Sequence, residues 1–136
     1  MKKMLPALSV GLGLLGAATG ALSTIACFRQ MGIDIEQSGT HVKIHGKGLH
    51  GLLAPANVLD AGNSGTTVRL MSGILSGQSF ESIITGDESI QKRPMKRVMT
   101  PLTQMNAAIS SINNNGCAPL KIEPARLSAI HYQSTE

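Results

Sequence analysis

The stretch RQMGIDIEQSGTHVKIHGKGLHGL, residues 29–52, decides the fold because much of it returns later in the chain. The stretch TQMNAAISSINNNGCAPLKIEPARLSAI, residues 103–130, repeats its Gln-Met pair, a polar turn with glycine, a Lys-Ile pair and a matching leucine. The copies are 74 positions apart at the Gln-Met pair and 78 apart at the Lys-Ile pair, which predicts a longer hairpin tip in the second copy. Such a repeated unit cannot bury its faces alone, so we expect it to stack against sister units.

Each copy predicts a helix that leads into an antiparallel hairpin. In the first copy, helical spacing over residues 22–31 ends at Gly32, and apolar residues then alternate on both sides of a Ser-Gly turn. In the second copy, a helix is expected over about residues 95–104, with Pro94 tolerated in its first turn and Pro101 as an interior kink or break. The strands AAISSI and PLKIE around the turn NNNG complete that copy.

The segment between the copies adds a strand, a helix and a second strand. NVLDAGNSGTTVRLMSGILSG, residues 57–77, predicts a short strand, a glycine-rich loop and a helix over residues 66–75 that Gly77 ends. SFESIITG, residues 79–86, follows as a strand. From about residue 57 to residue 122 the order is β-α-β-α-β-β. The fold class is therefore α+β, made of α/β-type repeats whose helices pack on sheet strands.

Composition narrows the classes of function. The chain has 136 residues, the size of one domain or part of one, and 42% of them are hydrophobic. It has two Phe, one Tyr and no Trp, so aromatic platforms for nucleic-acid bases are missing. The net charge is +4, and the basic residues cluster in QKRPMKR, residues 91–97, which favours a small anionic ligand over nucleic acid. Cys27 and Cys117 lack the spacing of a zinc site or a disulfide framework.

The first 21 residues, MKKMLPALSVGLGLLGAATGA, differ from the rest of the chain. Two lysines, an apolar run and a small-residue end are typical of a secretory signal peptide. The apolar run is short for a membrane span of about 20 residues and contains Pro6 and glycines, so no stable span is expected. We expect part of this segment to be helical and packed on the domain, with cytoplasmic residence, and export stays open as the alternative.

The loop DAGNSGTTVRL, residues 60–70, has two interpretations. Gly62 and Gly65 allow backbone N–H groups to approach a ligand, and the positive end of the following helix favours a phosphate or carboxylate there. Alternatively, Ser64 or Thr66 caps an ordinary helix, and the later Arg93 is solvated. A glycine-rich loop alone does not decide between the two.

A second motif makes the pattern more specific. LDAGNSGTTVRLMSGIL, residues 59–75, is followed by GDESIQKRPM, residues 86–95, within β-α-β-α-β-β units. This combination resembles the enolpyruvyl transferases, and within them the 5-enolpyruvylshikimate-3-phosphate synthases, over about residues 22–134. The resemblance implies part of one lobe of an inside-out barrel, with residues 22–136 as the partial lobe and about 57–122 as its complete unit. Residues 1–21 depart from the family pattern.

The resemblance also implies an activity and a site. The family transfers the carboxyvinyl group of phosphoenolpyruvate to the 5-hydroxyl of shikimate 3-phosphate and releases phosphate, on the shikimate pathway to chorismate and the aromatic amino acids. No metal or organic cofactor is implied. The residues implied to line the phosphoenolpyruvate side are Asn63, Gly65 and Thr66, with Arg93 as a bidentate clamp on the carboxylate or phosphate. Ser64 and Arg69 are expected to support them, and Lys92, Lys96 and Arg97 to form a solvated positive face.

Departures from the family limit these expectations. The sister enzyme that acts on UDP-N-acetylglucosamine has a reactive cysteine five residues before the arginine of its Arg-Pro pair, where this chain has Glu88. The early Asp-Lys-Ser segment of the family is absent, and so is the second lobe, which supplies the catalytic carboxylates. We therefore assign no catalytic residue and expect the chain alone to be inactive without a missing lobe. A fragment, a truncated or frame-altered product and an excised piece all stay open, as does a non-catalytic anion-binding or structural remnant.

Overall fold

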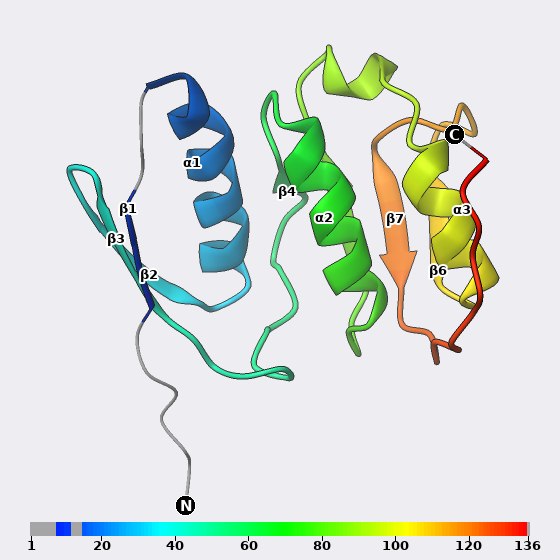
Figure 1. The fold of residues 1–136 in the computed structure, drawn as a ribbon, viewed down its shortest axis with the longest axis horizontal. Coiled ribbons are helices and arrows are strands. Elements are labelled where there is room, and N and C mark those ends of the chain that lie inside the picture. The colour runs from blue at the N-terminus through cyan, green and yellow to red at the C-terminus, as the bar shows by residue number, and fades with distance from the viewer. Residues whose placement is uncertain (1–7, 12–14, 136) are drawn as a thin grey trace, which may run out of the picture.

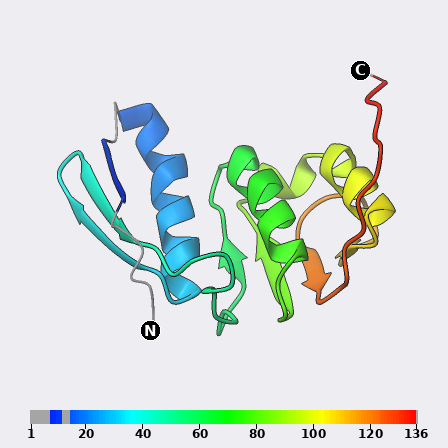
Figure 2. The ribbon, with the colours of Figure 1, turned by 60° about the horizontal axis from the view of Figure 1, so that its bottom comes forward.

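The computed structural model describes residues 8–11 and 15–135, which form two sheets, three α-helices and one 3-10 turn. Figure 1 shows α2 between α1 and α3, and Figure 2 shows the two sheets side by side. The elements in chain order are β1 (Leu8–Gly11), α1 (Leu15–Gln30), β2 (Asp34–Ser38), β3 (His41–His45), β4 (Leu59–Asp60), α2 (Gly65–Ser76), β5 (Ser82–Thr85), η1 (Ile90–Lys92), α3 (Lys96–Gln104), β6 (Ala108–Ser111) and β7 (Leu120–Glu123).

The first sheet contains the predicted hairpin and one strand that we did not predict. Its order is β1-β3-β2, and both pairings are antiparallel. Ile35 lies opposite Ile44 in the hairpin, and Leu8 of β1 pairs with Ile44 from the other side. α1 begins at Leu15, seven residues before the predicted start. The expected helix in the N-terminal segment is thus confirmed for residues 15–21, while residues 1–7 and 12–14 lie outside the described part.

The second sheet repeats this arrangement and extends it. Its order is β4-β5-β7-β6, in which β4 is parallel to β5 and the other pairs are antiparallel. Ile109 lies opposite Ile122, at the same 74- and 78-residue offsets from Ile35 and Ile44. The internal repeat is therefore confirmed, and β5 occupies in the second copy the place of β1 in the first.

The start of α3 differs from the prediction. The helix begins at Lys96, so Pro94 precedes it instead of lying in its first turn. The N–H group of Met95 donates to the carbonyl of Gly116 at 2.8 Å, and the Met95 side chain is fully buried. Met95 has φ −108° and ψ 10° and is the N-cap residue, so it lies just before the helix. Pro101 does not break α3, which continues to Gln104.

The core lies mainly in the second repeat. Its large cluster is built on α2 and the second sheet, and α1 contributes Cys27 and Met31 to it. The first repeat has a smaller cluster of four buried residues, namely Ile25, Ile33, Ile35 and Val42. An apolar groove of about 640 Å³ separates this smaller cluster from α2, and its lining includes Phe28, Ile44, Leu52 and Ile74. Among the helices that the structure describes, none has the length and hydrophobicity needed to cross a membrane.

Candidate functional site

The glycine-rich loop is a tight turn between β4 and α2. The Asp60 carboxylate accepts a hydrogen bond from the N–H of Gly62 at 2.8 Å. Gly62 has a φ of +56°, and a Cβ there would lie 2.7 Å from Oγ of Ser23 on α1. Only glycine combines this left-handed conformation with so close a neighbour. The turn is therefore fixed by its own sequence and by α1.

Ser64 is the N-cap of α2, as one of the two interpretations of the loop predicted. Its Oγ accepts hydrogen bonds from the Thr67 N–H at 3.1 Å and from the Thr67 hydroxyl at 2.7 Å. The Thr67 hydroxyl also meets that of Thr24 at 2.8 Å, which joins α1 to α2. The first N–H groups of a helix have no acceptor within it, so those of Gly65 and Thr66 remain at its positive end. Capping and anion binding are therefore compatible at this helix.

Two arginine side chains converge on Gly65. A Cβ at this buried glycine would lie 2.8 Å from Nη1 of Arg69 and 3.3 Å from Nη1 of Arg93. Arg69 also donates from Nη2 to the carbonyl of Pro94 at 3.3 Å, so it braces the segment that carries Arg93. Within residues 8–11 and 15–135, neither guanidinium has a carboxylate at ion-pair distance. Two positive groups beside a helix N-terminus form a site suited to an anion.

The segment 86–93 lies directly against the loop. The N–H of Asp87 donates to the Gly62 carbonyl at 2.9 Å, and a Cβ at Gly86 would lie only 2.6 Å from the same oxygen. The Asp87 carboxylate accepts from Asn63, Ser89 and the N–H of Ile90. These hydrogen bonds, above all that from the Ile90 N–H, hold the pKa of Asp87 below its ordinary value of 3.8. Asp87 is thus ionised at neutral pH.

All six residues predicted for the site lie at one end of α2: Asn63, Ser64, Gly65, Thr66, Arg69 and Arg93. The Nδ2 group of Asn63 is directed to Asp87 and Ser89, at 2.9 and 3.1 Å. Whether any of the six contacts a ligand stays a prediction. Sequence reasoning missed Asp87 and Ser89, although Asp-x-Ser before a short turn is a usual pattern for side chains that bond to the backbone.

Both cysteines are buried and have free thiols. Burial, and secondarily the charge of Asp60, raise the pKa of the Cys27 thiol to about 11. Its Sγ lies 3.5 Å from the Asp60 carbonyl, behind the loop. A protonated, enclosed thiol is a poor nucleophile, so Cys27 has a packing role.

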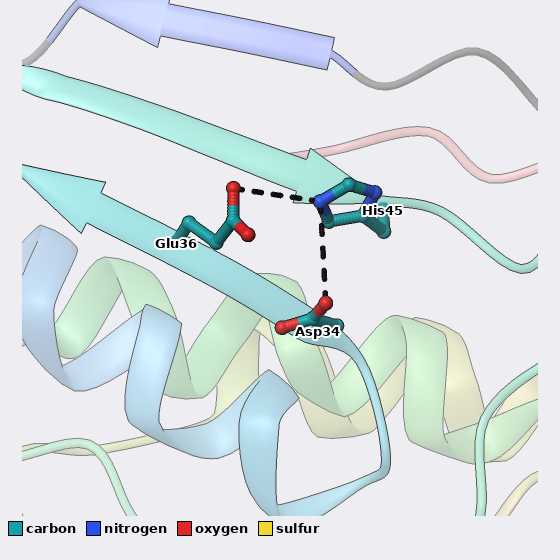
Figure 3. Close-up of side chains that lie close together, drawn as sticks. All are labelled: Asp34, Glu36 and His45. Carbon is teal, nitrogen blue, oxygen red and sulfur yellow. Dashed lines mark ion pairs between the residues drawn. The ribbon is translucent and has the colours of Figure 1, made fainter.

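A group with metal-binding residue types lies on the outer face of the first sheet (Figure 3). Nε2 of His45 is 3.6 Å from a Glu36 oxygen and 4.0 Å from an Asp34 oxygen. The carboxylates are well exposed, and Lys43 lies directly opposite Glu36 on the same face. The second repeat has a comparable ion-pair group, with Lys121 between two glutamates. We therefore interpret the His45 group as surface ion pairing, which contributes little to stability.

Comparisons with known proteins agree on one family. The sequence model for EPSP synthase (3-phosphoshikimate 1-carboxyvinyltransferase) matches residues 18–136. The 3-phosphoshikimate 1-carboxyvinyltransferase of Alkaliphilus metalliredigens is 58% identical over 113 residues, and the Bacillus subtilis enzyme is 55% identical over 113 residues. Each alignment covers 83% of this chain but only 27% and 26% of those proteins. The chain thus spans about a quarter of the length of the curated relatives it matches.

Solved structures give the same result. A 2.37 Å structure of EPSP synthase from Acinetobacter baumannii superimposes with a TM-score of 0.86 at 45% identity, over 93% of this chain and 28% of that one. A second structure of an Acinetobacter baumannii EPSP synthase gives a TM-score of 0.87 at 44% identity, over 96% of this chain and 30% of that one. The α+β fold with incomplete lobe architecture is therefore confirmed.

Proposed function

The chain belongs to the EPSP synthase family, and on that basis we propose that it forms part of the phosphoenolpyruvate side of a 3-phosphoshikimate 1-carboxyvinyltransferase site. The reaction moves the carboxyvinyl group of phosphoenolpyruvate to shikimate 3-phosphate and releases phosphate. One observation carries the proposal: Arg69 and Arg93 converge on Gly65 at the N-terminus of α2, with no carboxylate at ion-pair distance among the described residues.

Each group at this end of α2 has a distinct role in anion binding. The N–H groups of Gly65 and Thr66 point from the helix N-terminus toward the ligand. Arg93 is exposed and clamps the carboxylate or phosphate with two parallel N–H donors. Arg69 holds the Pro94 carbonyl and adds positive charge. These groups bind and orient phosphoenolpyruvate and stabilise negative charge on it.

We assign no catalytic residue to this chain. Proton donation to phosphoenolpyruvate and deprotonation of the attacking hydroxyl need groups within hydrogen-bond reach of the reacting atoms. The family resemblance attributes those groups to parts that this chain does not match. We therefore expect no turnover by the chain alone, and shikimate 3-phosphate to bind only when a further lobe is supplied.

The apolar groove supports the need for a further part of the lobe. It lies between the first repeat and α2, where Ile44 is half-buried and Ile74 is 41% exposed. Leu49 at its rim is 83% exposed. An apolar surface of this kind is typical of a face that another element covers. We propose that the remainder of the enzyme covers it in the active protein.

We also propose cytoplasmic residence. The segment that resembles a signal peptide includes β1, which pairs with β3 along its whole length, and the start of α1. Cleavage near residue 21 would remove a strand from the first sheet. N-terminal sequencing of the protein from cells checks this, since a mature chain that begins near residue 22 would contradict it.

A pair of variants tests the proposed site. Arg93→Ala removes the clamp, whereas Lys92→Ala removes an equal charge one position away, from an exposed side chain paired with Glu88 at 2.7 Å. Titration with phosphoenolpyruvate, followed by amide chemical shifts, gives the affinities. Loss of a charge-assisted contact worth about 1.5–3 kcal/mol should weaken binding by Arg93→Ala at least about tenfold. Equal effects of the two substitutions would show a general charge effect and contradict the clamp.

A phosphate-release assay separates the enzyme from a non-catalytic remnant. The chain alone should release no phosphate from phosphoenolpyruvate and shikimate 3-phosphate. Addition of the remaining part of a homologous synthase, as a separate polypeptide, should restore release. Anion binding without release in that mixture would favour a non-catalytic anion-binding protein.

A further inference from the structure

The anion site is made of two segments that are distant in sequence. We call residues 60–66 the glycine arm, because it carries Gly65 and the start of α2, and residues 86–93 the arginine arm, because it ends at Arg93. An anion held by both arms requires a fixed distance between them. What sets this distance is therefore part of the binding machinery.

In the described part of the chain, backbone-to-backbone hydrogen bonds join the two arms at one end. The Ala61 N–H donates to the Thr85 carbonyl at 2.8 Å, and the Asp87 N–H donates to the Gly62 carbonyl at 2.9 Å. These contacts lie near the sheet, several residues before Arg93. Arg93 is placed by the chain that follows Asp87, which turns through η1, and by Arg69 of α2, whose Nη2 donates to the Pro94 carbonyl at 3.3 Å.

The Asp87 carboxylate connects the two arms through its separate oxygens. Oδ2 accepts from Nδ2 of Asn63 on the glycine arm at 2.9 Å. Oδ1 accepts from the Ser89 hydroxyl at 2.8 Å and from the Ile90 N–H, the first of η1, at 3.0 Å. The turn closes with a hydrogen bond from the Arg93 N–H to the Ile90 carbonyl at 3.0 Å. A continuous path of hydrogen bonds thus links Asn63 to the backbone of Arg93.

We propose that Asp87 is a positioning residue that sets the distance between Gly65 and Arg93 in the anion site. Asn63 acts through it, because Nδ2 has two hydrogens and directs them to Asp87 and Ser89. The other end of its amide, Oδ1, is an acceptor, which an anion does not attract. The identity of the anion rests on the function proposed above, but the hydrogen-bond path does not.

The sign of a charge-neutralising substitution separates positioning from electrostatics. Asp87 is negative and lies near an anion site, so its charge alone weakens anion binding. Asp87→Asn removes that charge at almost constant shape. With its carbonyl oxygen toward Ser89 and Ile90, its amide nitrogen faces Nδ2 of Asn63 in the observed orientation, and two donors cannot bond to each other. Glu88→Gln removes the neighbouring exposed charge. It leaves the hydrogen bonds between the two arms in place, because Glu88 pairs with Lys92 of its own arm. Positioning predicts weaker binding for Asp87→Asn, whereas electrostatics alone predicts stronger binding for both variants.

The first experiment titrates the 136-residue wild type and both variants with inorganic phosphate and with phosphoenolpyruvate. We expect Asp87→Asn to lose about fivefold or more in affinity and Glu88→Gln to keep or slightly raise it. An equal rise in anion affinity in both variants would overturn the proposal. Asn63→Ala should reproduce the loss, and the Asn63→Ala/Asp87→Asn double variant should lose no more than either single variant. Additive losses would also count against a shared path.

A second readout needs no ligand and therefore survives a failure of the proposed function. In Asp87→Asn, the Arg93 Nε–Hε signal and the Gly65 amide signal should both shift or broaden relative to wild type, because the arms are no longer held together. Changes confined to residues 87–90, with Gly65 and the Asn63 side-chain amide unchanged, would reduce Asp87 to a local cap and overturn the proposal. If wild type binds neither probe, the proposed function fails while this comparison still decides the role of Asp87.

Discussion

The two repeats have the same hairpin register but bury it differently. Ile122 in the second repeat is completely buried in the main core, on a strand against which α2 packs, whereas its counterpart Ile44 in the first repeat is half-buried and lines the apolar groove. The local sequence patterns are alike, so the hairpins form alike. The difference comes from the segment that precedes the second copy: β4 extends its sheet at one edge, and α2 packs on that sheet. This segment, from β4 to the end of α2, also carries the glycine arm. One inserted segment thus both completes the main core and contributes to the anion site.

The largest expected effect tests this difference in burial. Ile122→Ala should lower the free energy of unfolding by about 2–5 kcal/mol, because it opens a cavity in the main core. Ile44→Ala should cost about 1 kcal/mol, because this side chain already faces the groove. Urea unfolding of both variants checks the prediction. Equal losses would mean that the first repeat is as well packed as the second.

A second prediction concerns Cys27, which α1 places in the core of the second repeat. Burial, and secondarily the charge of Asp60, raise the pKa of this thiol from its ordinary value of 9.0 to about 11 in the folded chain. As pH rises above 9, the thiol loses its proton in the unfolded chain before it does so in the folded chain, which stabilises the unfolded chain. The free energy of unfolding should therefore fall between pH 9 and pH 11, by up to about 2 kcal/mol. Subtraction of the same pH series for Cys27→Ala isolates the thiol. A difference that stays flat over this range would show that Cys27 is not held in the shared core.

A third prediction has the smallest effect on stability and sharpens the role of the inserted segment. Gly65→Ala places a methyl group against the ends of Arg69 and Arg93, which are flexible and move aside. Stability should change by less than about 1 kcal/mol, since alanine also favours the helix, while phosphate affinity falls. Gly73→Ala on the same helix meets nothing within 4 Å and should leave phosphate affinity unchanged. If phosphate affinity is unchanged in both variants, the anion does not bind beside Gly65 and its two arginines.

The elements that the sequence predicted correctly are those with local signals. Alternating apolar residues gave both hairpins, and Ser64 and Gly77 marked the ends of α2 within one residue. β1 was missed because its pairing with β3 depends on residues 30 to 36 positions away, and its glycine-rich surroundings resemble a signal peptide. α3 was also predicted within one residue at its start, although Pro94 lies before the helix and not in its first turn.

The same distinction applies to the site. The cap at Ser64 and the glycine-rich loop were recognised from local features of a helix N-terminus, whereas Arg93 was assigned to the site through the family resemblance. The role of Asp87 was not predicted, since it depends on a hydrogen bond to Asn63 across 24 positions. The convergence of Arg69 and Arg93 on Gly65 likewise appears only after β4 and β5 pair and bring the two arms together.

The most direct test of the anion site is a map of the amide and arginine Nε–Hε signals of the wild-type chain during titration with phosphoenolpyruvate. We predict that millimolar ligand shifts the Gly65 and Thr66 amides together with the Arg93 Nε–Hε signal, in one saturable step. Shifts confined to the exposed Lys96 and Arg97, or no shift at Gly65 and Thr66, would contradict an anion site at the N-terminus of α2.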